Sequence, residues 1–425
     1  MLKIKFAILY VVIIPFLTIR SGYGATPDFQ ESTFIGVCSQ VTRESPRYNP
    51  FAVHKELMDK TIAANINFTR FGFKWHTIHP SPDQWDWRVT DAVVASAAEK
   101  NLHILALITG MPNEVMDDPA ANIDIWLEFV DSLTTRYSED IFHWEIWNEP
   151  NLRNGKYWPP TELPGPFADY VMGAARVIRK NQPTATILLG GLATGQKSQP
   201  FKLWGSLFEL GVLDYVDGIA YHTYQYSGKG LIEFNQRISR LVEKYSTEEK
   251  EYWITEYGVP AIDSDQFARV SYDTQTKNLM KSILVHWATG GNKFFIFSIW
   301  DKADFTPDQT EKQLRKNRTY YYGLLEKDMT PKPSYFAVKW LSAQLEQYEP
   351  MDIQDTSDGL IISAKHKSSG NMVYFSWGSK AQKELMSSRN KKSLSLFETS
   401  ETQFTLDRVK SKTIKRHTQD VSIWR

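Results

Sequence analysis

The strongest constraint on the fold is a regular alternation, from residue 33 onward, of short apolar runs with longer amphipathic stretches. The runs have the length of β-strands and the stretches have the length of helices, which is the pattern of βα units around a parallel sheet. We predict strands at residues 34–39, 68–75, 103–109, 142–149, 186–192, 218–224, 252–257 and 293–300. Eight such strands close a barrel, so the sequence predicts an α/β fold of the (β/α)8 TIM barrel type.

Helical periodicity fills the intervals between these strands. Candidate helices lie at residues 88–100, 122–137, 166–180, 231–245 and 272–289, with a last one at 333–345. After Tyr348 the pattern changes to short alternating runs separated by polar turns, which is typical of antiparallel strands. A chain of 425 residues is long enough for both parts. We therefore predict a (β/α)8 barrel over residues 33–348 and a small β-rich accessory domain over residues 349–425.

The amino-terminal segment has the features of an export signal. Lys3 and Lys5 precede an apolar run at residues 6–19, which small residues follow. The run is shorter than the roughly 20 residues of a membrane-spanning helix. We expect a signal peptide over residues 1–25 and a secreted or periplasmic protein. The alternative is that residues 6–19 stay uncleaved and tether the chain to the outer face of the inner membrane.

The composition of the chain bears on its partners and on its covalent cross-links. Lys plus Arg and Asp plus Glu each number 49, so there is no basic excess of the kind that nucleic-acid binding requires. Cys38 is the only cysteine, which excludes an intramolecular disulfide. Aromatic residues make up 13% of the chain, and flat aromatic faces are suited to stacking on sugar rings.

Two carboxylates end predicted strands on opposite sides of the barrel. Residues 143–151 read H-W-E-I-W-N-E-P-N, in which Glu149 closes the fourth strand, and Glu256 in W-I-T-E-Y-G closes the seventh. Catalytic groups of such barrels lie at the carboxyl ends of the strands. Hydrolysis of a glycosidic bond needs one carboxylic acid to protonate the leaving oxygen and one carboxylate to attack carbon or activate water. We read Glu145, four residues earlier on the same face, as a buried hydrogen-bonded residue of the barrel.

These motifs resemble those of known enzymes. W-N-E-P and T-E-Y-G resemble the acid/base and nucleophile motifs of clan A retaining glycoside hydrolases, and E-I-W-N-E-P-N-L most resembles family 39, with families 5 and 51 related. The resemblance covers about residues 33–348. It implies that Glu149 is the acid/base and Glu256 the nucleophile. It also implies that Asn148 donates a hydrogen bond to the 2-hydroxyl of the sugar.

The same resemblance assigns supporting roles at the barrel mouth. Arg70 would keep Glu256 ionised, and His222 or Tyr224 would hydrogen-bond the nucleophile. Trp300 would form the stacking floor under the reacting sugar. Separately, Trp75, Tyr157 and Trp158 lie in predicted mouth loops, where their rings are candidate platforms for further sugar units.

The function expected from these features is hydrolysis of β-glycosidic bonds in a polysaccharide or oligosaccharide, with no metal or organic cofactor. A looser resemblance to exported family 39-like proteins associated with bacterial exopolysaccharides favours endo-acting cleavage. Two alternatives stay open: an exo-acting β-xylosidase or β-glucosidase, and a non-catalytic carbohydrate-binding barrel. The fold does not fix the substrate.

Overall fold

The structure is a computed structural model, and it describes residues 31–39, 50–152, 158–195, 199–262, 271–303, 313, 318–378, 393–395 and 422–424. Residues Ser32–Arg425 form one compact unit. The expected signal peptide, the alternative anchor at residues 6–19 and the candidate platform Tyr157 lie outside the described residues. Among the described residues, no helix is both long and apolar enough to cross a membrane.

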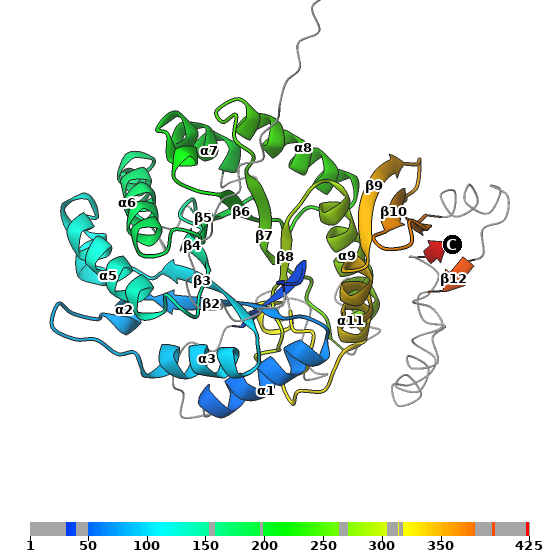
Figure 1. The fold of residues 1–425 in the computed structure, drawn as a ribbon, viewed down its shortest axis with the longest axis horizontal. Helices are drawn as coiled ribbons and strands as arrows, with labels where there is room; N and C mark the ends of the chain where they lie inside the picture. The colour runs from blue at the N-terminus through cyan, green and yellow to red at the C-terminus, as the bar shows by residue number, and fades with distance from the viewer. Residues whose placement is uncertain are drawn as a thin grey trace, which may run out of the picture. The chain divides into compact units, whose positions relative to one another are not determined.

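Eight parallel strands close into a barrel in their chain order, which confirms the predicted fold (Figure 1). The strands are β1 (Ile35–Ser39), β2 (Phe68–Lys74), β3 (His103–Thr109), β4 (His143–Asn148), β5 (Thr186–Ala193), β6 (Gly218–His222), β7 (Glu251–Tyr257) and β8 (Lys293–Ile296). Each one falls on a predicted run. The barrel closes because β1 pairs with β2 on one side and with β8 on the other.

Helices on the outside of the barrel connect the strands, as Figure 1 shows. They are α1 (Pro50–Ala63), α2 (Trp75–Ile78), α3 (Arg88–Glu99), α4 (Asn113–Met116), α5 (Ile123–Arg136), α6 (Gly165–Asn181), α7 (Pro200–Glu209), α8 (Lys229–Glu243) and α9 (Tyr272–Ala288), with α11 (Pro333–Leu345) after the last strand. In α6 the buried side chains include Phe167, Tyr170, Val171, Ala174 and Ile178, the spacing of a single helical face. That face is covered by the barrel, which explains why the amphipathic pattern predicted the helix.

The barrel interior holds its own apolar cluster beneath the mouth. Phe68 lies in its centre, with ring centroids 5.7 Å from Trp253 and 5.0 Å from Phe295. Gly36 on β1 makes this packing feasible, because a Cβ there would lie 2.4 Å from the Phe295 ring. The filled interior leaves the open end of the barrel as the place for a binding site.

The predicted eighth strand was too long. Strand β8 ends at Ile296 rather than at residue 300, and the chain then pairs with residues 322–325. The amide of Ser298 donates to the carbonyl of Tyr322 (3.1 Å), and the amide of Leu325 donates to that of Ile299 (2.9 Å). The run stays apolar because this second ladder is buried too, so periodicity alone does not reveal the change of partner.

The chain after α11 forms the expected antiparallel sheet. Strands β9 (Tyr348–Asp355), β10 (Leu360–His366) and β11 (Met372–Trp377) pair in succession, and the three-residue strands β13 (Ser422–Trp424) and β12 (Ser393–Ser395) continue the sheet beyond β11. This sheet lies against α9 and α11 (Figure 1). Phe375 packs edge-on against Trp287 of α9, with ring centroids 6.0 Å apart, so the sheet shares an apolar core with the outside of the barrel.

Candidate active site

Glu149 follows directly after β4, in a turn that the neighbouring strand holds in place. Its amide donates to the carbonyl of Gly191 on β5 at 2.8 Å. The backbone has a positive φ at both Trp147 (φ 79°) and Glu149 (φ 46°), a conformation that residues other than glycine rarely adopt. Such strain occurs mainly where a functional site requires it. Gly190 permits the turn, because a Cβ there would lie 2.0 Å from the carbonyl oxygen of Trp147.

Glu256 lies near the end of β7, and its carboxylate is held by two donors. Arg70 Nη1 donates to Oε1 at 2.6 Å, and the Tyr224 hydroxyl donates to Oε2 at 2.7 Å. The residue is only 9% exposed. Of the two residues expected beside Glu256, Tyr224 is therefore the one that donates to it.

Arg70 is the central cation of the site. It is 4% exposed and lies on the inner face of β2, from which its guanidinium reaches three acceptors. Besides Glu256 these are Glu145, through Nε at 2.5 Å and Nη2 at 3.1 Å, and Asn148 Oδ1, through Nη2 at 2.9 Å. This fork fixes the orientation of the Asn148 amide, since the oxygen accepts from Arg70 and the nitrogen is left to donate toward the cleft.

Glu145 is fully buried, as the sequence indicated. Besides Arg70, it accepts hydrogen bonds from the Gly191 amide at 3.0 Å and from the Thr255 hydroxyl at 2.9 Å. These donors satisfy a carboxylate that would otherwise be costly to bury. Glu145 thus holds Arg70 from below, while Glu256 faces the cleft.

The surroundings of Glu256 favour its charged form. Burial alone raises the pKa of this carboxyl, but the His222 imidazole, the Arg70 guanidinium and the Tyr224 hydrogen bond together lower it by more. The net result is a pKa below the usual value. Glu256 is therefore ionised and able to act as a nucleophile.

His222 connects the two glutamates. Its Nδ1 lies 2.8 Å from Oε1 of Glu149 and 3.7 Å from Oε2 of Glu256. Burial lowers the pKa of His222. The carboxylates of Glu256 and Glu149 raise it by more than burial lowers it, so the net pKa lies above its usual value. The ring fits only because β5 has Gly191 beside it, where a Cβ would lie 2.2 Å from Nε2.

The two glutamates bring carboxylate oxygens close together at the barrel mouth. One ligand atom each from Glu149, His222 and Glu256 lies within 4.8 Å of the other two. Retaining glycosidases place their two carboxyl groups about 5–5.5 Å apart, whereas inverting enzymes need a wider gap for water. These three side chains also have the types that bind metals. Here, however, the Arg70 guanidinium donates to Oε1 of Glu256 and the Tyr224 hydroxyl donates to Oε2, so both oxygens of this carboxylate already have partners.

An open cleft of about 650 Å³ lies over these residues. Four expected residues line it around Glu256: Arg70, Asn148, Glu149 and Tyr224. The other lining residues are Cys38, Ser39, Gly72, Lys74, Leu107, Thr109, Gln225, Phe297, Lys302, Thr319 and Tyr322. The aromatic walls Phe297 and Tyr322 were not singled out from the sequence. Phe297 directly follows β8, and its position at the mouth becomes visible only once the true end of that strand is known.

Three expected platforms for sugars do not lie on the cleft. Trp300 is half-buried beyond the end of β8, and its Nε1 donates to the carbonyl of Lys327 at 2.9 Å. Trp75 and Trp158 are both completely buried. Trp75 stacks on Phe129, with centroids 5.8 Å apart, and Trp158 packs edge-on against Trp147 at 5.1 Å. Their apolar rings complete the core between strands and helices, so neither can offer a face to a sugar.

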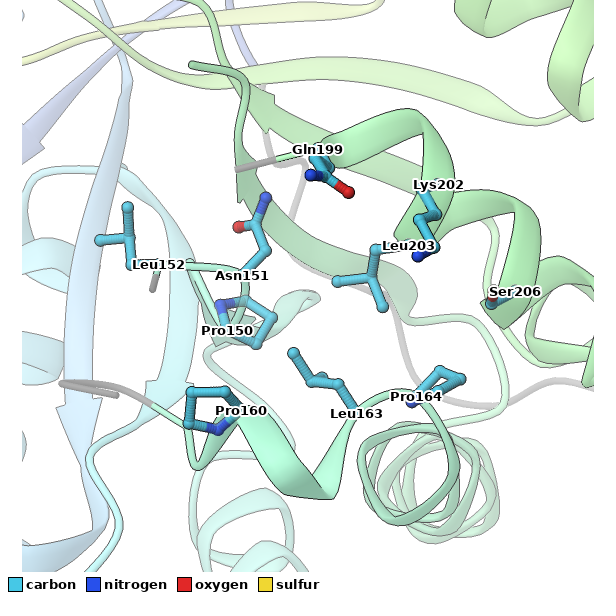
Figure 2. A pocket seen from close by; sticks show the side chains of 10 residues that line it. All are labelled: Pro150, Asn151, Leu152, Pro160, Leu163, Pro164, Gln199, Lys202, Leu203 and Ser206. Carbon is cyan, nitrogen blue, oxygen red and sulfur yellow. The ribbon is translucent and has the colours of Figure 1, made fainter. Parts of the chain in front are cut away.

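A second cavity of about 300 Å³ lies on the other side of the Glu149 turn. Figure 2 shows it between the segment that follows Glu149 and one face of α7, with Leu163 and Leu203 pointing into it. Asn151 forms part of its wall, and its side chain bonds both the amide and the carbonyl of Ala193 on β5 (3.0 and 2.7 Å). The wall of this cavity is therefore fixed to the strand that also holds Glu149.

Solved structures similar to this chain share its barrel. A family 39 glycoside hydrolase from Bacteroides cellulosilyticus WH2 is 17% identical, with a TM-score of 0.63 over 86% of this chain and 73% of that one. A family 39 β-xylosidase from Caulobacter crescentus is 16% identical, with a TM-score of 0.55 over 85% and 80%. Xylanase 10B from Thermotoga petrophila is 18% identical, with a TM-score of 0.52 over 74% and 94%.

Sequence comparison identifies the family. No curated protein matches the chain significantly. The family model described as cellulase, glycosyl hydrolase family 5, matches residues 29–302, which include β1 to β8 and both glutamates. The likeness to family 39 structures agrees with the resemblance seen in the motifs, since both families belong to clan A, whose members retain the anomeric configuration. The chain thus belongs to the cellulase family of glycoside hydrolases, glycosyl hydrolase family 5.

Proposed function

We propose that this glycoside hydrolase is an exported, endo-acting enzyme that cleaves β-linked polysaccharide by double displacement, with Glu149 as acid/base and Glu256 as nucleophile. The observation that carries the assignment is the short separation of the two carboxylates, within 4.8 Å, at the barrel mouth. Their different surroundings support the division of roles, because Arg70 and Tyr224 donate hydrogen bonds to Glu256, whereas Glu149 is contacted by His222.

In the first step the Glu256 carboxylate attacks the anomeric carbon of the bound sugar. The bond from that carbon to the leaving oxygen breaks, and the oxygen takes the proton of Glu149. The product is an ester between the sugar and Glu256. Asn148, oriented by Arg70, is placed to donate to the sugar 2-hydroxyl, and that bond strengthens as positive charge develops on the ring.

In the second step water enters from the side that the leaving group has vacated. Glu149, now a carboxylate, removes a proton from this water, whose oxygen bonds to the anomeric carbon. The ester bond to Glu256 breaks, and the negative charge returns to that carboxylate beside Arg70. Two inversions give net retention of configuration.

Endo-acting cleavage is supported by room on both sides of the Glu149 turn. The main cleft, about 650 Å³, lies well inside the range of 300–1,000 Å³ that is usual for ligand sites, and it is open. The second cavity begins at Pro150, directly beyond Glu149. A chain that crosses this turn would have sugar units bound before and after the point of cleavage.

Azide rescue tests the two roles separately. Glu256→Ala should abolish turnover of an aryl β-glycoside, and azide should restore it with the inverted glycosyl azide as product, because the anion occupies the vacated space. Glu149→Ala should still form the glycosyl-enzyme from substrates with good leaving groups, and azide should then give the retained product. The opposite stereochemistry would exchange the roles, and an inverted first product from the wild-type enzyme would exclude double displacement.

Product length tests the mode of action. Incubation with plant β-glucans, xylans, mannans and bacterial exopolysaccharides should release a series of oligosaccharides early in the reaction. Monosaccharide as the only early product would overturn the endo-acting proposal in favour of an exo-acting β-xylosidase or β-glucosidase. Binding without any hydrolysis, with Glu149→Gln equal to wild type, would mean a carbohydrate-binding barrel.

A further inference from the structure

The turn after β6 carries a glutamine that the proposed chemistry does not use. The turn is closed by the amide of Tyr226, which donates to the carbonyl of Thr223 at 2.9 Å, and the amide of Thr223 donates to the carbonyl of Glu256 at 3.3 Å. The two residues at its tip, Tyr224 and Gln225, both line the cleft. Tyr224 donates to Glu256, and its neighbour Gln225 lies beside the reacting groups without a part in the steps described above.

The orientation of the Gln225 amide is fixed by Thr194. This threonine follows β5 and is buried, and its hydroxyl donates to the carbonyl of His222 at 2.5 Å. A hydroxyl group has a single hydrogen, so Thr194 can only accept from Gln225, whose Nε2 lies 2.7 Å from the hydroxyl oxygen. The amide of Gln225 therefore turns its nitrogen to Thr194. Its oxygen, which can accept two hydrogen bonds, is the polar atom that it offers to a ligand.

Gln225 is held before any ligand binds. The residue is exposed, and an exposed glutamine side chain ordinarily exchanges among several rotamers. The bond to a buried hydroxyl restricts this freedom in the folded protein. The entropy of ordering the side chain is then not lost again on binding, which makes its amide oxygen a pre-organised acceptor.

The position of Gln225 determines which sugar it meets. Glu149 is tied to Gly191 of β5, and Thr194 lies three residues further along the same segment, toward the mouth. Gln225 thus reaches from the end of β6 toward β5 and the side of Glu149, whereas β7 with Glu256 lies on the other side of β6. Because Glu149 must contact the leaving oxygen, the first sugar of the leaving portion passes over the end of β5, within the region that Gln225 borders.

We propose, building on the proposed function, that Gln225 is a specificity-determining residue for the leaving side, and that its amide oxygen accepts a hydrogen bond from a hydroxyl of the first leaving-side sugar. An acceptor in this place favours a neutral sugar with a free hydroxyl and disfavours a carboxylate, which has no hydrogen to donate. A leaving group without a hydroxyl gains nothing from Gln225.

The same contact serves a sugar that enters after the first step. Such a sugar takes the place of water: Glu149 removes the proton of its hydroxyl, the hydroxyl oxygen bonds to the anomeric carbon, and the ester bond to Glu256 breaks. The product is a longer glycan with retained configuration. Gln225 should therefore also favour transfer to a sugar over hydrolysis.

Matched substrates with different leaving groups test the proposal. They are cellotetraose with 4-nitrophenyl β-cellobioside, and xylotetraose with 4-nitrophenyl β-xylobioside. The nitrophenyl group offers no hydroxyl, so it measures cleavage without the Gln225 contact. Gln225→Met keeps the length of the side chain but removes the acceptor. It should lower the ratio of kcat/KM for the tetrasaccharide to kcat/KM for the nitrophenyl glycoside by about 3- to 10-fold, the effect of one hydrogen bond.

Two further positions locate the effect. Thr194→Val removes the hydroxyl that orients Gln225 and should lower the same ratio, whereas Thr194→Ser keeps that hydroxyl and should preserve it. Gln354→Met removes an exposed glutamine of β9 and is the matched control, with no change in the ratio expected. The proposal is overturned if Gln225→Met leaves the ratio unchanged, as it would if the glutamine only supported the turn. Since Gln225 is exposed, this variant decides the matter even where Thr194→Val does not fold.

Transfer gives a second measure and separates the inference from the proposed function. With a nitrophenyl glycoside as donor and cellobiose or xylobiose as acceptor, nitrophenol counts the glycosyl-enzyme formed, and the longer oligosaccharide counts transfer. The transferred fraction should fall in Gln225→Met. If the wild-type enzyme cleaves neither donor nor tetrasaccharide, the proposed function fails and the inference with it. If it cleaves them but Gln225→Met changes neither the ratio nor the transferred fraction, the function stands and the inference is wrong.

Discussion

The buried ion pair between Asp301 and Lys332 should be a strong determinant of stability. Both side chains are completely buried, and Lys332 Nζ lies 2.6 Å from Asp301 Oδ2. The other carboxylate oxygen accepts from the Gly323 amide at 2.6 Å, and Nζ also donates to the carbonyl of Ala261 at 2.9 Å. The pair therefore joins α11 to the two segments that place Phe297, Lys302 and Tyr322 on the cleft.

Lys332→Met removes the cation and leaves a buried carboxyl without it. Breaking such a pair typically costs about 3–5 kcal/mol of unfolding free energy. The unit Ser32–Arg425 should gain about 0.8 kcal/mol/K of entropy on unfolding, at 2.1 cal/mol/K per residue. The midpoint of thermal unfolding at pH 8 should thus fall by about 4–6 °C in a calorimetric scan at fixed rate.

The pH dependence of this loss has a definite sign. Burial raises the pKa of Asp301, Lys332 opposes the rise, and the net pKa is about 7. Without Lys332 the pKa should rise further. A carboxyl whose pKa is higher in the folded state supports folding while it is protonated, and this support is lost as the pH rises through the folded pKa. The variant should therefore lose less stability at pH 5 than at pH 8.

Two further variants make the reasoning refutable. Lys332→Met with Asp301→Asn removes both charges and should recover much of the lost midpoint, because no uncompensated ion is left. Lys339→Met on the exposed side of α11 should shift the midpoint by less than about 1 °C. A double variant less stable than either single one, or a loss at pH 5 equal to that at pH 8, would refute this account of the pair.

Three other outcomes follow from the site and from the amino-terminal segment. His222→Asn keeps a donor near Glu149 but removes a charge that lowers the Glu256 pKa, so the acidic limb of the kcat/KM profile should move to higher pH; an unmoved limb would contradict this. Tyr224→Phe removes one of the donors to Glu256 and should lower kcat by about 10- to 100-fold with little change in folding, as circular dichroism can check. Amino-terminal sequencing of the exported protein should begin near Ala25, and Met1 on a membrane-bound protein would favour the anchor.

Strand order and the positions of the two glutamates could be predicted because both depend on local pattern. Each strand falls on a short segment rich in apolar residues, and each glutamate stands at or near the end of one, so chain order alone places both at the same end of the barrel. Arg70 and Glu145 could be placed on inner faces by alternation. Their mutual hydrogen bonds depend on the registers of separate strands, which periodicity does not contain.

The prediction that Trp75 and Trp158 face a sugar was wrong for a related physical reason. The residues around Trp75 and Trp158 in the sequence do not show whether each ring faces a sugar or the core. They are buried because Phe129 of α5 packs on Trp75 and Trp147 of β4 packs on Trp158, and these contacts form only in the folded chain. Lys74 was equally hard to place, since it looks like the polar end of any strand until Gly72 and the barrel mouth are seen together.

Gly190 and Gly191 on β5 have a consequence for protein engineering. These two positions leave the room in which the Glu149 turn and the His222 ring are placed, although neither glycine supplies a functional group. The position of Glu149 thus depends as much on the neighbouring strand β5 as on the N-E-P motif itself. Grafting that motif onto another barrel without a matching pair of glycines would transfer the carboxylate but not its position, and a library that randomises β5 would lose activity while every catalytic residue stayed intact.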